Sequence, residues 1–151
     1  MKEGTRLTIS GALLLIAAVM VISFGGIFMA FNAIVDNPEI TEELEKLYEE
    51  NSEIWAKQGI ESFEEFKDSI SNILFPLGIV TLIQGVIILL GSIFAFIRKI
   101  YILPMVGAIM GILNITIFFV VPAVLSIVAL YLTWKEKDLF VKPKPTGELK
   151  L

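Results

Sequence analysis

Residues 69–97 read SISNILFPLGIVTLIQGVIILLGSIFAFI, a stretch of 29 residues without Asp, Glu, Lys, Arg or His. A helix of about 18 or more such residues is long enough to cross the hydrocarbon core of a bilayer. Residues 7–35 and 100–134 of the 151-residue chain share this property. Charged residues make up only 19% of the sequence, against about 25% in soluble domains. The sequence therefore predicts an integral membrane protein.

The last of these stretches is too long for a single crossing. Its 35 residues would extend roughly 50 Å as a helix, whereas the hydrocarbon core is about 30 Å thick. Pro122 suits the first turn of a helix and disfavours helix just before it, so we expect an outer hairpin at residues 118–120. The predicted fold is an all-α membrane four-helix bundle with transmembrane segments at residues 7–35, 69–97, 100–117 and 121–135.

The distribution of charge predicts the orientation of these segments. The N-terminal residues 1–6, the turn at 98–99 and the tail at 136–151 are each net positive, whereas residues 36–68 contain 12 acidic and three basic side chains. Lys and Arg near the ends of membrane helices favour the cytoplasmic side. Four crossings place all three basic segments in the cytoplasm, whereas three crossings would place the lysine-rich tail outside. We therefore expect a multi-pass protein of the cell membrane with both termini in the cytoplasm.

The acidic loop at residues 36–68 is expected to form a helical extracellular cap. Asn37 and Pro38 are typical of a helix start, and Gly59 is a natural helix stop. A second start at Ser62 has the capping-box pattern and predicts a helix that continues into the second transmembrane segment. Apolar residues fall at helical spacing between these signals. The apolar face of the cap is predicted to contain Leu44, Leu47, Tyr48 and Trp55.

Two locations are open for this apolar face. It would lie either in the headgroup layer of the membrane or against protein, meaning the ends of the transmembrane helices or a partner. Interfacial helices are usually basic, and anionic lipid would repel an acidic one, so we expect burial by protein. The carboxylates at Glu42, Glu45, Glu49 and Glu53 lie on one side of a straight helix, which cannot wrap around a cation. We interpret them as a solvated face and predict no metal site.

Small and polar residues within the transmembrane segments indicate how the helices pack. Glycines permit close approach of helix backbones. The candidate packing positions are Gly25, Gly26, Gly85, Gly91, Gly107 and Gly111. We expect the face that carries Gly107 to contact the first segment near Gly25 and Gly26, or near Ala17 and Ala18; the alternative is a homodimer seam.

Two amides, Gln84 and Asn114, are candidates for lining a polar cavity. The alternative role for these amides is hydrogen bonding between helices.

The composition also limits the classes of function. Because the chain has no His and no Cys, it contains neither a Ser-His-Asp set nor a thiolate nucleophile, and we predict no enzyme activity and no cofactor. A net charge of −4 argues against nucleic acid as a partner. The first hypothesis is a scaffold or accessory subunit in the lipid bilayer whose acidic cap contacts a membrane protein partner. The alternative is an oligomeric transporter or channel for a small solute, formed around Gln84 and Asn114.

The second half of the chain has a recognisable layout. A glycine-rich segment ends in the basic pair Arg98-Lys99, a short glycine-rich hairpin follows, and the end is rich in lysine. In this layout, residues 76–138 resemble a family of uncharacterised prokaryotic four-span membrane proteins, described as a domain of unknown function. The resemblance implies a topology and no activity. The large first loop is also similar to that of claudins and tetraspanins, but those loops rely on cysteines, which this chain lacks.

Overall fold

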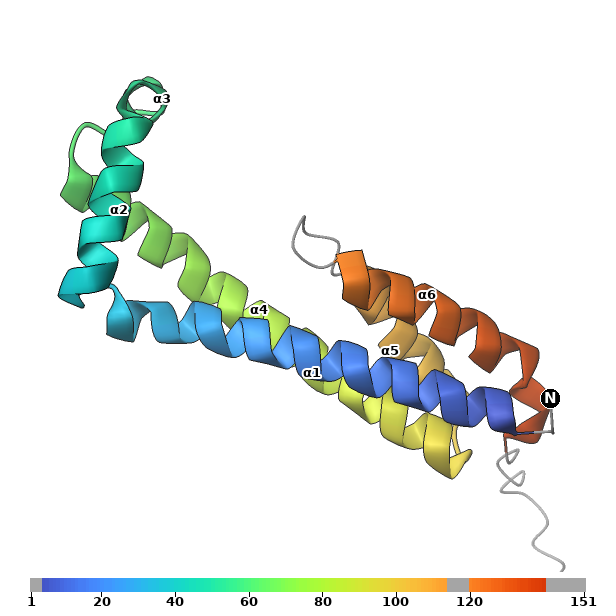
Figure 1. Cartoon of the computed structure of the whole chain (residues 1–151). Coiled ribbons are helices and arrows are strands. Elements are labelled where there is room, and N and C mark those ends of the chain that lie inside the picture. The colour runs from blue at the N-terminus through green and yellow to red at the C-terminus, as the bar shows by residue number, and fades with distance from the viewer. Residues whose placement is uncertain (1–3, 114–119, 141–151) are drawn as a thin grey trace, which may run out of the picture. The chain divides into compact units, whose positions relative to one another are not determined.

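The computed structural model describes residues 4–113 and 120–140 (Figure 1). The described residues form α-helices and one short 3-10 helix and no strand, which confirms the all-α class. The elements are α1 (Thr5–Ile34), α2 (Pro38–Glu50), α3 (Ser52–Lys57), α4 (Phe63–Ile97), α5 (Ile102–Leu113), α6 (Val120–Lys135) and η1 (Lys137–Leu139). By length and composition, α1 and α4 are long and apolar enough to cross a membrane. Asn114 and most of the predicted hairpin at 118–120 lie outside the described residues.

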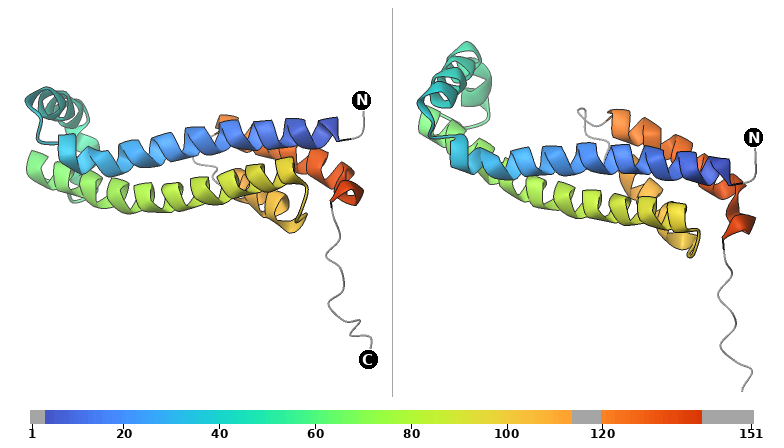
Figure 2. Two further views of the ribbon diagram at one scale, coloured as in Figure 1. Left: turned by 90° about the horizontal axis from the view of Figure 1, so that it is seen from below. Right: turned by 60° about the horizontal axis from the view of Figure 1, so that its bottom comes forward.

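The chain divides into two compact units, one of residues 1–22 with 83–151 and one of residues 23–82. In the first unit, parts of α1, α4, α5 and α6 lie alongside one another (Figure 2). Each of these helices contributes residues to one apolar core. The buried residues of this core are Leu14, Ala17, Ala18, Val21, Ile88, Ala108 and Ala129. Because four of the seven are alanines (two in α1 and one each in α5 and α6), the helices approach one another closely.

Buried hydroxyl groups connect the helices of the first unit. Ser10 Oγ donates to the carbonyl oxygen of Ala129 at 2.9 Å and lies 2.7 Å from Thr133 Oγ1, which joins α1 to α6. Ser92 Oγ donates to the carbonyl oxygen of Gly11 at 2.8 Å, which joins α4 to α1. Hydrogen bonds of this kind between apolar helices contribute about 0.6–2 kcal/mol each. They hold α1 between α4 and α6.

The second unit contains α2, α3 and the adjoining parts of α1 and α4. Gly25 and Gly78 lie where these two helices touch, because a Cβ on either would lie 2.9 Å from a backbone nitrogen of the other helix. Lys67 Nζ lies 3.1 Å from Asp36 Oδ1 and 3.3 Å from Glu64 Oε2. The first of these ion pairs connects the turn after α1 to the first turns of α4.

Local signals explain where the helices of the second unit begin and end. The side chain of Asn37 accepts a hydrogen bond from the Glu39 amide at 3.0 Å, so α2 begins with the predicted cap. Gly59 has a φ of +82°, and the amides of Gly59 and Ile60 donate to the carbonyl oxygens of Ala56 and Trp55. This is the Schellman arrangement that glycine favours at the end of a helix.

One break in the second unit differs from the expected continuous helix between Asn37 and Gly59. Asn51 has φ −121° and ψ 18°, and it separates α2 from α3. Its side-chain amide donates to the carbonyl oxygen of Leu47 at 2.9 Å, while its backbone amide bonds only three residues back, to Tyr48, at 3.2 Å. Local side-chain bonds of this type compete with the helical pattern. The break therefore follows from the asparagine.

Candidate functional site

We call residues 36–68 the cap; they comprise α2, α3, the turns beside them and the beginning of α4. The cap has an aromatic cluster of its own, centred on Phe66, which is only 1% exposed. The ring centroids of Trp55 and Tyr48 lie 4.8 Å and 5.5 Å from that of Phe66, and Phe63 lies 6.1 Å from Tyr48. Aromatic pairs at these separations contribute about 0.5–1.5 kcal/mol each beyond the area they bury. The cluster fixes α2 and α3 on the first turns of α4.

The residues of the predicted apolar face lie in two environments. Tyr48 and Trp55 are half-buried in the aromatic cluster, and Leu44 is also half-buried. Leu47 is 46% exposed, and the neighbouring Ile54 is 53% exposed. The face therefore has an inner part, which α4 covers, and an outer part that the described chain leaves open.

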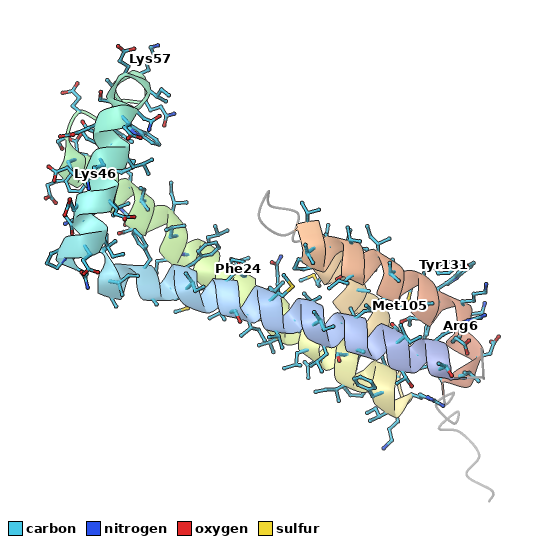
Figure 3. All side chains as sticks on the ribbon, viewed as in Figure 1. Arg6, Phe24, Lys46, Lys57, Met105 and Tyr131 are labelled. Atoms are coloured by element: carbon cyan, nitrogen blue, oxygen red, sulfur yellow. The ribbon has the colours of Figure 1, made fainter. Side chains whose placement is uncertain are left out.

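All 12 carboxylates of the cap are exposed. Only three lysines accompany them, and Figure 3 labels two of these, Lys46 and Lys57. Lys46 Nζ donates to Glu42 Oε1 at 2.7 Å, and this hydrogen bond and the lysine charge lower the pKa of Glu42 below its usual value. Within the described residues, no group of three or more carboxylates converges as metal ligands would. The cap thus presents a negative surface next to two exposed aliphatic side chains.

The candidate packing glycines occupy different places. Gly91 and Gly107 face each other, because a Cβ on either would lie 3.0 Å from the Cα of the other. Gly107 therefore contacts α4, whereas we expected α1. The reason is that α5 follows α4 after a short turn, so the two helices are antiparallel neighbours. Gly26 is exposed, and a Cβ there would meet no atom within 4 Å.

The remaining glycines contact side chains of neighbouring helices. A Cβ on Gly85 would collide with Ile22 of α1, and one on Gly111 would collide with the hydroxyl of Ser126 in α6. Ser126 Oγ is buried and has no hydrogen-bond partner within the described residues. It occupies the space that Gly111 leaves, so the contact serves packing.

The two candidate cavity residues are not brought together by the described structure. Gln84 is half-buried in α4, and Asn114 lies outside the described residues. Ser10 and Thr133, whose hydroxyls connect α1 to α6, were not among the predicted residues. The available signal was their position, since each is a small polar residue near the end of a long apolar stretch.

Comparisons with family models, with curated proteins and with solved structures found no match to this chain.

Proposed function

We propose that the protein is a small interaction protein of the cell membrane, a scaffold or accessory subunit, whose cap docks a basic segment of a partner protein. The observation that carries this proposal is the construction of the cap. Its aromatic cluster holds α2 and α3 in place, while all of its carboxylates and the side chains of Leu47 and Ile54 remain exposed. An apolar contact surrounded by charge of one sign favours a partner of complementary charge.

The proposed location is a multi-pass arrangement in which α1, α4, α5 and α6 cross the bilayer. In the first unit, large aliphatic side chains are exposed on every one of these helices. Examples are Ile16 at 52%, Ile83 at 56%, Ile109 at 44% and Ile127 at 52%. Soluble proteins rarely expose so much contiguous apolar surface, and lipid tails would cover it. The basic flanks favour cytoplasmic termini, with the cap outside.

Cysteine labelling tests this topology. The chain has no cysteine, so single substitutions provide unique labels. We expect Lys57→Cys in the cap to react with a membrane-impermeant maleimide in intact cells. Lys137→Cys should react only after the membrane is permeabilised. Labelling of both positions in intact cells would contradict the proposed arrangement.

Site-specific photocrosslinking tests the docking surface. A photoreactive amino acid at Leu47 should form a protein adduct in native membranes, and the same amino acid at Ile16 should not. Glu43→Gln with Glu50→Gln should remove the adduct, because these carboxylates are exposed beside Leu47 along α2. High salt should also lower the yield of the adduct, since salt screens the attraction between exposed charges. An adduct that survives both changes would refute docking by charge, and a monomer without any adduct would refute the interaction itself.

A further inference from the structure

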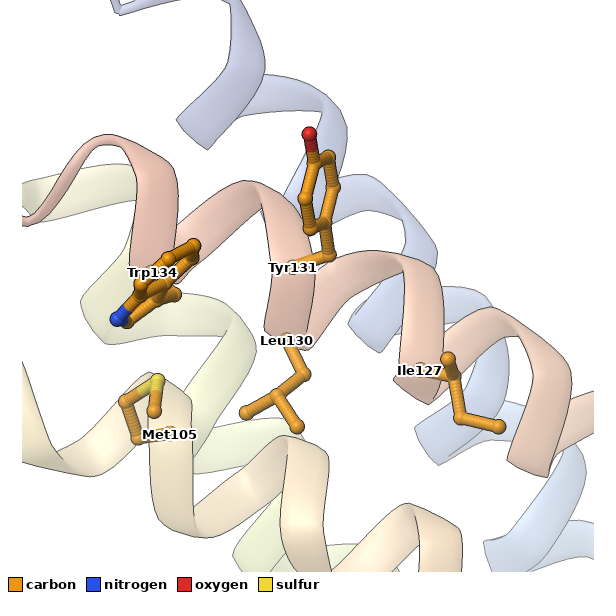
Figure 4. Close-up of a pocket in the computed structure, with 5 residues that line it drawn as sticks. All are labelled: Met105, Ile127, Leu130, Tyr131 and Trp134. Carbon is orange, nitrogen blue, oxygen red and sulfur yellow. The ribbon is translucent and has the colours of Figure 1, made fainter.

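A groove of about 410 Å³ lies between α5 and α6 in the first unit (Figure 4). Met105 of α5 lines it, together with Ile127, Leu130, Tyr131 and Trp134 of α6. The α6 residues follow the i, i+3, i+4, i+7 spacing of one helix face, so they form one stripe of roughly 10 Å along the helix. Figure 4 shows Met105 and Trp134 at one end of the groove and Ile127 towards the other. The volume suits a small ligand or a single acyl chain.

A cation lies beside Tyr131, one of the residues that line this groove. Lys135 Nζ donates to the hydroxyl of Tyr131 at 3.3 Å and lies 5.6 Å from the centroid of the Tyr131 ring. Within the described residues, no carboxylate lies within 4.0 Å of this ammonium group. The adjacent Glu136 forms its ion pair with Arg6 instead, at 3.3 Å. The charge of Lys135 is therefore available to an anion.

The apolar stripe and the cation together match the chemistry of one kind of lipid. Trp and Tyr favour the level of the headgroups, and lysine at the end of a membrane helix reaches the same level. The proposed orientation puts Lys135 on the cytoplasmic side, where the leaflet carries anionic lipids. We propose that the groove binds one acyl chain of an anionic phospholipid and that Lys135 binds its phosphate. This inference rests on the membrane location proposed above.

Tryptophan fluorescence provides the test. The chain has two tryptophans, so Trp55→Phe leaves Trp134 as the only one. The full chain is reconstituted into phosphatidylcholine vesicles that contain equal fractions of either brominated phosphatidylglycerol or brominated phosphatidylcholine, because bromine quenches a tryptophan that it touches. We expect brominated phosphatidylglycerol to occupy the groove about five-fold more readily than brominated phosphatidylcholine, as judged by the quenching of Trp134. This factor is the size of the attraction between one lysine and an anionic surface.

Lysine variants identify the residue responsible. Lys135→Gln should reduce the preference to about one, whereas Lys99→Gln, a change of the same charge in the turn before α5, should leave it intact. Equal quenching by the two lipids, or a preference that survives Lys135→Gln, would overturn the lipid site and leave the membrane location standing. Protection of Trp134 from both lipids in a chain that still requires detergent would show a second copy in the groove, which also overturns the proposal. A chain that stays soluble without detergent and is quenched by neither lipid would instead refute the membrane location.

Discussion

Replacing Phe66 with alanine is expected to unfold the cap and to leave the first unit folded. Phe66 is 1% exposed, and it is the ring that Trp55, Tyr48 and Phe63 share, with centroid separations of 4.8, 5.5 and 6.4 Å. Its removal eliminates all three ring contacts at once. The remaining cap helices have 13 and 6 residues, and helices of that length are marginal in water without tertiary contacts.

The size of the effect follows from the burial of the ring. Truncating a buried phenylalanine to alanine costs about 3–5 kcal/mol. The lower end of this range applies here, because the partners Tyr48 and Trp55 are half-buried and can move into the space. A loss of about 3 kcal/mol corresponds to an increase on the order of 100-fold in the population of the open cap.

Hydrogen exchange followed by mass spectrometry in detergent measures this population for α2 and α3 separately from α5 and α6. We expect faster exchange in α2 and α3 and unchanged exchange in α5 and α6. Phe75→Ala is the matched control, because this phenylalanine of α4 is 40% exposed and its loss should leave the cap unchanged. Normal protection of α2 and α3 in the Phe66 variant would refute the conclusion that the aromatic cluster holds the cap.

Three further outcomes are expected. Gly107→Leu should prevent folding of the first unit at every protein concentration, because a Cβ there would lie 3.0 Å from the facing backbone of α4, whereas Gly26→Leu meets open space and should keep the native elution profile in detergent. Ser10→Ala should lower the free energy of unfolding in detergent by about 1–2 kcal/mol, since it removes two buried hydrogen bonds between helices; an unchanged value would contradict their role. Lys46→Ala should raise the pKa of Glu42 in a carboxyl NMR titration, because the hydrogen bond and charge of the lysine lower it. Since the folded pKa lies below the usual one, any contribution of this pair to stability is present at neutral pH and is lost as the pH falls through the pKa of Glu42. Because both side chains are exposed, that contribution is too small to shift the thermal midpoint at neutral pH.

The helix boundaries of the cap could be predicted because short-range chemistry determines them. Asn37 caps α2, Gly59 has the left-handed backbone that ends α3, and the hydroxyl of Ser62 accepts from the Glu65 amide at 3.2 Å. Each of these signals acts within about four residues, so the local sequence is enough to predict the helix boundary. The break at Asn51 is also local, but an asparagine within a helix permits more than one hydrogen-bonding pattern, and the sequence does not distinguish them.

Contacts between distant segments were harder to predict. A glycine in an apolar helix indicates that another helix approaches closely but does not identify that helix, so the pairing of Gly107 with α4 was missed. The central position of Phe66 was missed for a similar reason, since its helical spacing indicates a buried face but does not say which rings will meet it. The groove beside Lys135 arises only when α5 and α6 are packed together.

The ion pair between Asp36 and Lys67 has a consequence for how the chain could be redesigned. The cap begins at Asp36, and Lys67 is the residue before its last; the paired atoms of these two side chains are 3.1 Å apart. Segments whose two ends lie close together are the ones that proteins exchange for other inserts with least disturbance, because a new insert must close only a short gap. We therefore expect that residues 37–66 can be replaced as a module. A different small domain with adjacent termini, grafted between Asp36 and Lys67, should be carried by the same pair of helices.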